Sequence, residues 1–254
     1  MITAGIDVGA VTTKVVILKE GKIIGDSMVT TGIEQKKSAE QALDEAIKKA
    51  GIPRNDIERI TATGTGSKAI DFANSEVTDV EADAIGANFL YPQARTVIDV
   101  GGEEGRGIKV DEKGRVIDFA LNERCAAGAG AFTEAMSRAL EVKVDEMGEL
   151  SRKSTKDVEI NAQCAVFAES EVVSLIHAKT AKPDIARAVH DGIASRITSM
   201  VRRVGVEKDV ALIGGVSKNA GFVDCLKKHL AMDLLIPDEP QIVGALGAAI
   251  IAAS

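Results

Sequence analysis

The chain has 254 residues, which is enough for two lobes with separate cores of about 125 residues each, or for one large domain. Its formal net charge of −7 argues against a general nucleic-acid surface, which needs a basic stripe. No stretch approaches the roughly 18 apolar residues of a membrane span, and the first residues lack a signal-peptide pattern. Composition therefore predicts a cytoplasmic protein that binds neither nucleic acid nor membrane.

The N-terminal lobe is expected to span residues 1–95. Apolar runs bounded by turn residues predict strands, and the first two of these runs are typical of a β-hairpin with a glycine-bearing loop. Apolar positions at a spacing near 3.6 predict one helix, which Gly51 and Pro53 end. The expected elements are strands at 2–7, 14–18, 23–30 and 57–63 and a helix at 38–50.

A second copy of the opening pattern begins at Thr96. The tetrapeptide Ile-Asp-Val-Gly recurs there, and Ile98 follows Ile6 by 92 positions. The later glycine turn at Gly114 follows the one at Gly21 by 93 positions. Matching turns at nearly the same offset predict an internal duplication, with one hairpin opening each half.

The C-terminal lobe is expected to span residues 96–254 and to become helical after its hairpin. The stretch 244–249 consists mainly of glycine and alanine, which is typical of a helix that packs very close to its neighbours and can pack back on the N-terminal lobe. The other expected elements are helices at 127–140, 145–152, 165–177 and 185–204, a helix ending near 230, and strands at 158–160 and 210–213.

Two aspartates end equivalent strands just before glycine. Asp7 and Asp99 are candidates for ordering a hydrated Mg²⁺ and a water molecule, while the glycine turns beside them bind phosphate oxygens. A third glycine turn follows the strand at 210–213, so the pattern predicts a bound nucleoside triphosphate. The residues expected around it are Gly9, Thr12, Thr13, Lys14, Gly101 and Gly102 at the phosphates, and Gly214, Gly215 and Lys218 at the nucleoside.

Two of the three cysteines stand in the same kind of place. Cys125 and Cys164 each follow a polar turn and precede a predicted helix, where unpaired backbone N–H groups favour a thiolate. The alternative is that both are buried structural cysteines, because cysteine is among the most commonly buried residue types. Cys225 lacks this setting and is expected in the core.

The order of the motifs resembles that of the superfamily of acetate and sugar kinases, heat-shock chaperones and actin. Asp-Val-Gly, Asp-Val-Gly-Gly, Gly-Gly-Val-Ser-Lys-Asn and a small-residue helix follow one another along the whole chain. The resemblance implies an α/β fold with two duplicated actin/ribonuclease H-like lobes and an ATP cleft between them.

The cysteine motifs narrow this resemblance. Asn-Glu-Arg-Cys-Ala-Ala-Gly-Ala-Gly at 122–130 and Cys-Ala-Val-Phe-Ala-Glu-Ser-Glu-Val at 164–172 are similar to motifs of ATP-dependent activators of 2-hydroxyacyl-CoA dehydratases and of benzoyl-CoA reductase subunits. The resemblance implies that Cys125 and Cys164 of two identical subunits bind one 4Fe–4S cluster, which needs four thiolates. It also implies that ATP drives a low-potential electron to a CoA-ester dehydratase or reductase, with reduced ferredoxin or flavodoxin as the donor.

The chain departs from this family at three places. Glu103 and Glu104 stand where activators usually have Gln-Asp, so Glu103 becomes the candidate residue near the attacking water. Ala10 and Val11 replace a common Ser-Thr, and residues 64–67 replace an aromatic residue and an arginine.

Two other functions stay open on the sequence alone. One is a small-molecule kinase, such as an amino-sugar kinase, with its substrate in the cleft and no cluster, although the short loops leave little room for a sugar-binding insertion. The other is a non-catalytic, actin-like assembly protein in which the cysteines are incidental.

Overall fold

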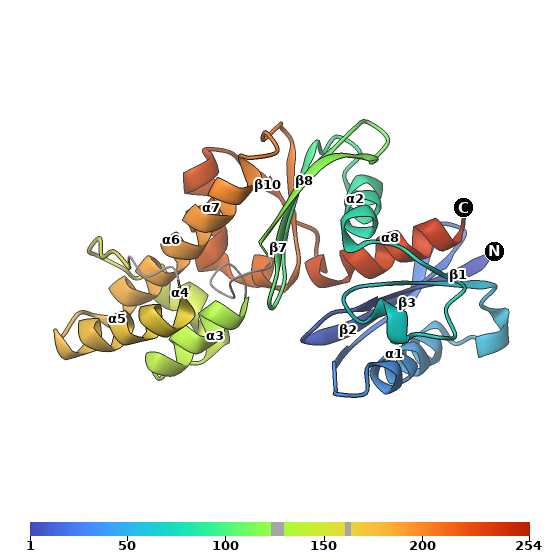
Figure 1. Cartoon of the computed structure of the whole chain (residues 1–254), viewed down its shortest axis with the longest axis horizontal. Helices are drawn as coiled ribbons and strands as arrows, with labels where there is room; N and C mark the ends of the chain where they lie inside the picture. Colours follow the sequence, from blue (N-terminus) through green and yellow to red (C-terminus); the bar gives the residue numbers. More distant parts are fainter. Residues whose placement is uncertain (123–129, 161–163) are drawn as a thin grey trace. The chain divides into compact units, whose positions relative to one another are not determined.

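A computed structural model describes residues 1–122, 130–160 and 164–254. The chain forms two compact units, and Figure 1 follows it through them in colour. The first unit comprises Met1–Val97, Ile108–Asp118 and Pro237–Ser254, and the second comprises Ile98–Gly107 and Phe119–Ile236. The chain therefore returns to the first unit twice after leaving it.

The first five-stranded sheet has the strand order β3-β2-β1-β4-β5. The β1–β2 and β2–β3 pairs are antiparallel, as predicted for the opening hairpin, and β4 pairs with β1 in parallel. Glu20 and Gly21 both have positive φ (51° and 75°), which is the geometry that a two-residue hairpin turn needs. The strands are β1 (Ile2–Val8), β2 (Thr12–Lys19), β3 (Lys22–Thr30), β4 (Arg59–Thr63) and β5 (Ser75–Glu76).

Helix α8 (Val243–Ala252) packs against β1 and against α2 (Asp79–Leu90) with almost no side-chain volume between the backbones. A Cβ atom at Gly5 would overlap the carbonyl of Ala245, and one at Gly247 would overlap the carbonyl of Ala82. The Thr3 hydroxyl also donates to Ala249 O at 2.8 Å. These close approaches explain the small-residue composition of α8 noted in the sequence.

Helix α2 was not among the predicted elements. Most of its buried residues are small, because α8 packs closely against them. The sequence of α2 therefore lacks the stripe of larger apolar residues that indicates an amphipathic helix. Its start nevertheless carries a signal, because Thr78 is an N-cap residue: its hydroxyl accepts from Glu81 N and donates to the Glu81 carboxylate. The other long helix of the first unit is α1 (Gln35–Ala50), which ends at Gly51 as predicted.

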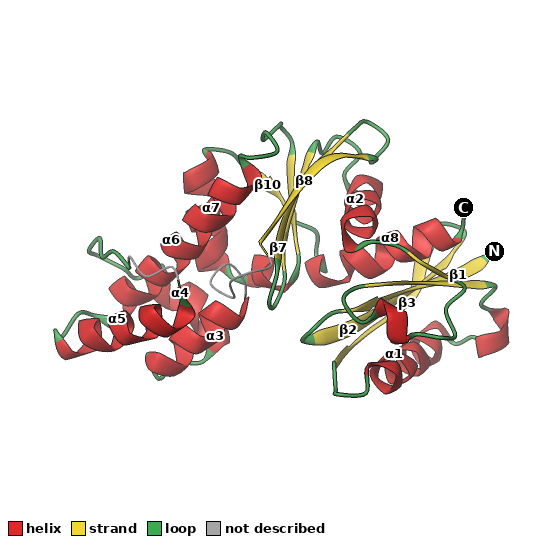
Figure 2. Cartoon of the chain, viewed as in Figure 1, coloured by secondary structure: helices red, strands yellow, loops and turns green. Residues whose placement is uncertain are grey.

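The second five-stranded sheet has the order β10-β9-β6-β7-β8, and Figure 2 separates the strands from the helices. Among the described residues, no helix is long and apolar enough to cross a membrane. The strands are β6 (Thr96–Val100), β7 (Gly105–Val110), β8 (Val116–Asn122), β9 (Val210–Ile213) and β10 (Leu234–Leu235). The helices are α3 (Gly130–Ala139), α4 (Met147–Ser151), α5 (Ala165–His177), α6 (Lys182–Val201) and α7 (Ala220–Leu230).

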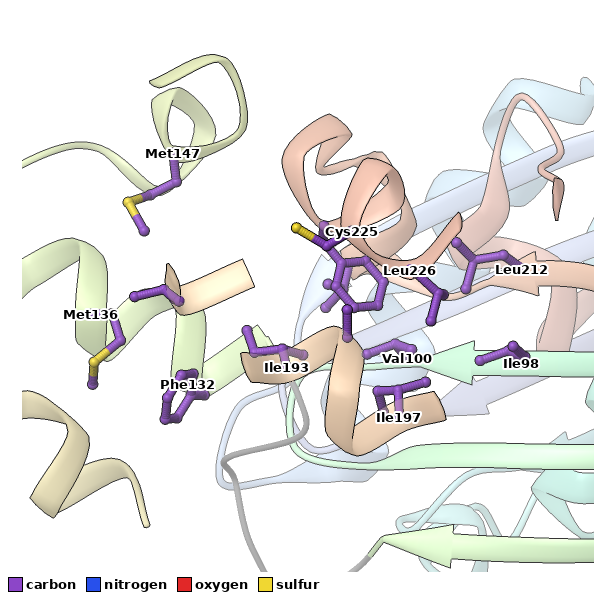
Figure 3. Packing of buried hydrophobic residues seen from close by; sticks show 14 of the residues in the cluster. Ile98, Val100, Phe132, Met136, Met147, Ile193, Ile197, Leu212, Cys225 and Leu226 are labelled. Atoms are coloured by element: carbon purple, nitrogen blue, oxygen red, sulfur yellow. The ribbon is translucent and has the colours of Figure 1, made fainter. Parts of the chain in front are cut away.

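The core of the second unit joins its sheet to its helices. One buried hydrophobic cluster contains Val100 of β6, Phe132 of α3, Ile193 of α6 and Cys225 of α7 (Figure 3). Cys225 is fully buried, as predicted, and burial raises the pKa of its thiol to about 11. Its sulfur is therefore a neutral apolar group of the core.

The strand predicted at 158–160 is wrong, because these residues form no strand in the structure. The preceding loop is held by Asp184, whose carboxylate accepts from Thr155 N at 2.8 Å and from Lys156 N at 3.1 Å. These backbone hydrogen bonds lower the pKa of Asp184. Ile160 packs against the core although it lies in a loop. An apolar residue is therefore needed here without a strand being formed.

Candidate functional site

The first glycine loop, residues 8–12, joins β1 to β2 in the first unit. Asp7 and Lys14 face each other across the two strands, and Lys14 Nζ lies 2.9 Å from Asp7 Oδ2. Both side chains are mostly buried. The loop is closed by a hydrogen bond from Gly9 N to Thr12 O at 3.1 Å. The two strands that flank this loop therefore present an aspartate and a lysine that form an ion pair.

The second glycine loop, residues 100–104, has the same arrangement in the second unit. Arg106 Nη1 donates to Asp99 Oδ2 at 2.6 Å, and Gly101 N donates to Glu104 O at 2.9 Å. Asp99 is 7% exposed. Arg106 Nη2 also donates to Glu104 Oε2 at 2.7 Å, so one guanidinium holds two carboxylates.

The two loops correspond residue by residue. Asp99 and Arg106 follow Asp7 and Lys14 by 92 positions, the offset found in the sequence. The loop-closing hydrogen bonds obey the same offset. The structure thus confirms the predicted duplication. Arg106 was not among the predicted site residues, although adding the offset to Lys14 would have found it.

The two glutamates of the second loop differ in their surroundings. The Glu104 carboxylate is bonded to Arg106, whereas the Glu103 side chain is exposed. Of the two glutamates, Glu103 therefore has the more accessible carboxylate for contact with a water molecule.

The third glycine turn follows β9 and lies against the second loop. Gly214 has φ +86°, and a Cβ atom there would overlap Asp99 Oδ1 and the Val100 carbonyl. Gly215 and Lys218 are exposed next to it, in one turn of 3₁₀ helix. Of the three predicted nucleoside residues, the structure therefore places Gly214 against Asp99, and Gly215 and Lys218 follow it in the same turn.

Gly64 occupies the matching place in the first unit. It has φ +92°, and a Cβ atom there would overlap the backbone of Val8. Gly66 N donates to Val8 O at 3.0 Å. Residues 64–66 therefore support the first glycine loop as Gly214 supports the second.

The two threonines of the first loop differ in exposure. Thr12 is half-buried at the end of the loop, whereas Thr13 is fully buried, with its Oγ1 2.8 Å from Thr31 Oγ1. Thr31 was not predicted as a site residue. Nothing in the strand pattern of β3 indicated that the residue after it would contact this loop.

Cys164 is exposed and is the residue directly before α5, with its carbonyl accepting from Ala168 N at 2.9 Å. The predicted position before a helix is therefore confirmed for this cysteine. Cys125 lies outside the described residues. Among residues 1–122, 130–160 and 164–254, no group of three or more His, Cys, Asp or Glu is arranged to hold a metal ion.

Helix α3 is bonded directly to the second glycine loop. Gly130 N donates to Gly101 O at 2.9 Å, and Ala131 N donates to Gly102 O at 2.7 Å. The first N–H groups of a helix have no partner within the helix, so the loop carbonyls satisfy two of them. The loop and the start of α3 are consequently one hydrogen-bonded structure.

A buried histidine lies behind the third turn. His190 is fully buried on α6, and its Nε2 accepts from Asn219 Nδ2 at 3.0 Å, as a neutral imidazole can. Burial, with a smaller contribution from Arg187, lowers the pKa of His190 to about 4. Histidine here supports the structure and carries no proposed role in chemistry.

We expect His190 to make folding pH-dependent. Between pH 6.5 and about 4 the unfolded chain binds a proton that the folded chain does not, so stability falls as pH falls. From pH 7.5 to 5 this residue should lower the free energy of unfolding by about 2 kcal/mol. Urea unfolding measures the free energy of unfolding at both pH values. Its decrease from pH 7.5 to 5 should be smaller for His190→Gln than for the wild type. His177→Gln, at an exposed site, should keep the wild-type decrease, and equal decreases in all three proteins would contradict the assignment.

The two α/β units with duplicated aspartate-glycine loops define a two-lobed, actin-like protein, which confirms the predicted fold class. The chain belongs to the BadF/BadG/BcrA/BcrD ATPase family, whose sequence profile matches residues 4–252. The predicted family is thereby confirmed.

Individual relatives match the chain over nearly all of its length. The activator of lactoyl-CoA dehydratase from Anaerotignum propionicum is 42% identical over 253 residues, covering 99% of this chain and 97% of the relative. Component A of the (R)-2-hydroxyglutaryl-CoA dehydratase from Acidaminococcus fermentans superposes with a TM-score of 0.96 at 38% identity, covering 99% and 97% of the two chains. The activator of the 2-hydroxyisocaproyl-CoA dehydratase from Clostridium difficile, with bound ADPNP, gives 0.93 at 37% identity, covering 99% and 94%.

Proposed function

We propose that this ATPase is an activator that transfers a low-potential electron to a 2-hydroxyacyl-CoA dehydratase or a benzoyl-CoA reductase-type partner. The observation that carries the proposal is the pair of equivalent loops, each with an aspartate and a basic partner, in a chain whose second loop bonds to α3. The relatives named as dehydratase activators support the identity of the partner.

In this proposal the glycine loops bind the phosphates of ATP, and Asp7 and Asp99 order Mg²⁺ and water. A bound Mg²⁺ neutralises phosphate charge and orients the phosphates. Lys14 and Arg106 hold the two aspartates in place, and Glu103 contacts the attacking water. The remaining contacts come from Gly9, Thr12, Gly101 and Gly102 at the phosphates and from Gly214, Gly215 and Lys218 at the nucleoside. Thr13, which was also expected at the phosphates, is fully buried, so its hydroxyl supports the loop from inside the fold.

The proposed 4Fe–4S cluster is shared by two copies of the chain. Cys164 fits this role because its thiol is exposed directly before the first residue of α5. Val166 and Phe167, the first apolar side chains of α5 after it, are 69% and 70% exposed. A second copy would cover them while its own Cys125 and Cys164 complete the four thiolates. When bound, the cluster supplies one-electron redox chemistry.

Coupling in this proposal runs through α3. A change of the second glycine loop on ATP hydrolysis shifts Gly101 O and Gly102 O, and α3 follows because Gly130 N and Ala131 N are bonded to them. Cys125 precedes this helix in sequence by a few residues. The electron donor is a reduced ferredoxin or flavodoxin, and the protein acts in the cytoplasm under anaerobic conditions.

Anaerobic purification with iron counting and ATPase assay tests the proposal. We expect a brown dimer with about four irons per two chains and MgATP-dependent release of phosphate. A colourless monomer after anaerobic reconstitution with iron and sulfide would contradict it. Phosphorylation of an amino sugar would instead favour the kinase alternative, and ATP-dependent polymerisation without iron would favour the assembly protein.

A further inference from the structure

Thr31 lies directly after β3, beside the first glycine loop. Its backbone N–H donates to Val11 O at 2.9 Å. Its Oγ1 lies 2.8 Å from Gly9 O and 2.8 Å from Thr13 Oγ1. Thr31 therefore contacts the loop at three points, through both its main chain and its side chain.

The single hydrogen of a hydroxyl group fixes the direction of these bonds. The Gly9 carbonyl can only accept, so Thr31 Oγ1 donates to Gly9 O and must accept from Thr13 Oγ1. The Thr13 hydrogen is consequently directed at Thr31. Since Thr13 is also fully buried, its hydroxyl supports Thr31 from inside the fold.

The bond to Gly9 O also orients the next amide group. The peptide unit between Gly9 and Ala10 is planar and trans, so its C=O and N–H point in opposite directions. With the carbonyl directed at Thr31, the Ala10 N–H is directed away from it. Ala10 and Val11 are exposed at this point of the loop.

We propose that Thr31 is a positioning residue for the nucleotide, which it serves by directing the Ala10 N–H at a phosphate oxygen of ATP. The inference rests on the proposed function, because it takes the first glycine loop to bind phosphate. Backbone N–H groups at glycine turns are suited to anionic oxygens.

The second glycine loop holds the equivalent carbonyl with a different donor. Gly101 O, 92 positions after Gly9 O, accepts from the Gly130 N–H at 2.9 Å. A hydroxyl in the first unit and a helix N–H in the second thus fix the same peptide unit. Because two different donors fix the same carbonyl in the two loops, we infer that both loops need this peptide unit in one orientation.

Three substitutions at adjacent threonines test the inference. Thr31→Val keeps the shape and removes the hydroxyl, Thr31→Ser keeps the hydroxyl, and Thr30→Val changes an exposed neighbour. We expect Thr31→Val to weaken MgADP binding and to raise the KM for MgATP about tenfold with kcat nearly unchanged. Thr31→Ser and Thr30→Val should stay within about threefold of wild type, which calorimetric titration and steady-state kinetics measure.

A fourth variant, Thr13→Val, is expected to have an intermediate loss of nucleotide affinity. Thr13→Val removes the donor to Thr31 but leaves the bond from Thr31 to Gly9, so its loss of affinity should lie between those of Thr31→Ser and Thr31→Val. A Thr31→Val protein with a lower Tm but wild-type affinity would overturn the inference, as would a Thr31→Ser protein as weak as Thr31→Val. If Thr31→Val does not fold, Thr31→Ala gives the same comparison. Wild-type protein that binds no MgADP would contradict the proposed function as well.

Discussion

Replacing Asp99 with Asn is expected to lower the turnover number for ATP about 100- to 1,000-fold. The carboxylate is 7% exposed and is held by Arg106 Nη1 at 2.6 Å, so it occupies one position beside the second glycine loop. The amide has the same size but lacks the negative charge that we propose orders Mg²⁺ and water. Steady-state release of phosphate from MgATP measures the loss.

Glu104→Gln is the matched control for this result. It removes the charge from the other carboxylate bonded to Arg106 and leaves Asp99 intact, so turnover should stay within about tenfold of wild type. Thermal unfolding of both variants separates a loss of chemistry from a loss of fold. If Asp99→Asn kept turnover within a few-fold of wild type, Asp99 would have no part in the chemistry.

Replacing Cys164 with Ser is expected to abolish iron binding while MgATP hydrolysis persists. A serine hydroxyl does not ionise as a thiol does, and the proposed cluster would lose one ligand from each of the two chains. Cys164 is exposed, so the substitution should leave the unfolding midpoint nearly unchanged. Iron content after anaerobic reconstitution and the visible absorption spectrum measure the effect.

Cys225→Ala is the control for this substitution. Cys225 is buried among apolar residues of the second core and has a raised pKa, so its thiol is not available as a thiolate ligand. This variant should keep about four irons per dimer and lose some stability. Full iron content in Cys164→Ser protein would show that the cluster, if present, is bound elsewhere.

The strands and loops around Asp7 and Asp99 could be predicted because short stretches of sequence are enough to indicate them. Each strand is a short apolar run, each loop is marked by glycine, and the repeat at 92 positions connects them. Helix α2 could not be predicted in this way. Its buried residues are small because another helix, distant in sequence, lies against them. That requirement comes from tertiary packing, which no pattern within α2 reports.

The residues of the candidate site also divide into those that the sequence indicates and those that only the folded structure reveals. Lys14 was predicted from its place in the loop, and Arg106 could have been found from the repeat. Thr31 could not, because its role depends on two oxygen atoms that only the folded chain brings within 2.8 Å. The apolar residues at 158–160 gave a false strand since Asp184, far along the chain, holds the preceding loop.

The contact between Thr3 and Ala249 has a consequence for how the protein is made. These residues stand 246 positions apart, yet β1 needs α8 to cover it. During synthesis, β1 leaves the ribosome early and stays without this cover until α8 has also emerged. The second unit, whose residues are all translated before α8, can fold first. The part of the chain translated first is therefore expected to be the last to reach its final structure, and to need protection from aggregation meanwhile.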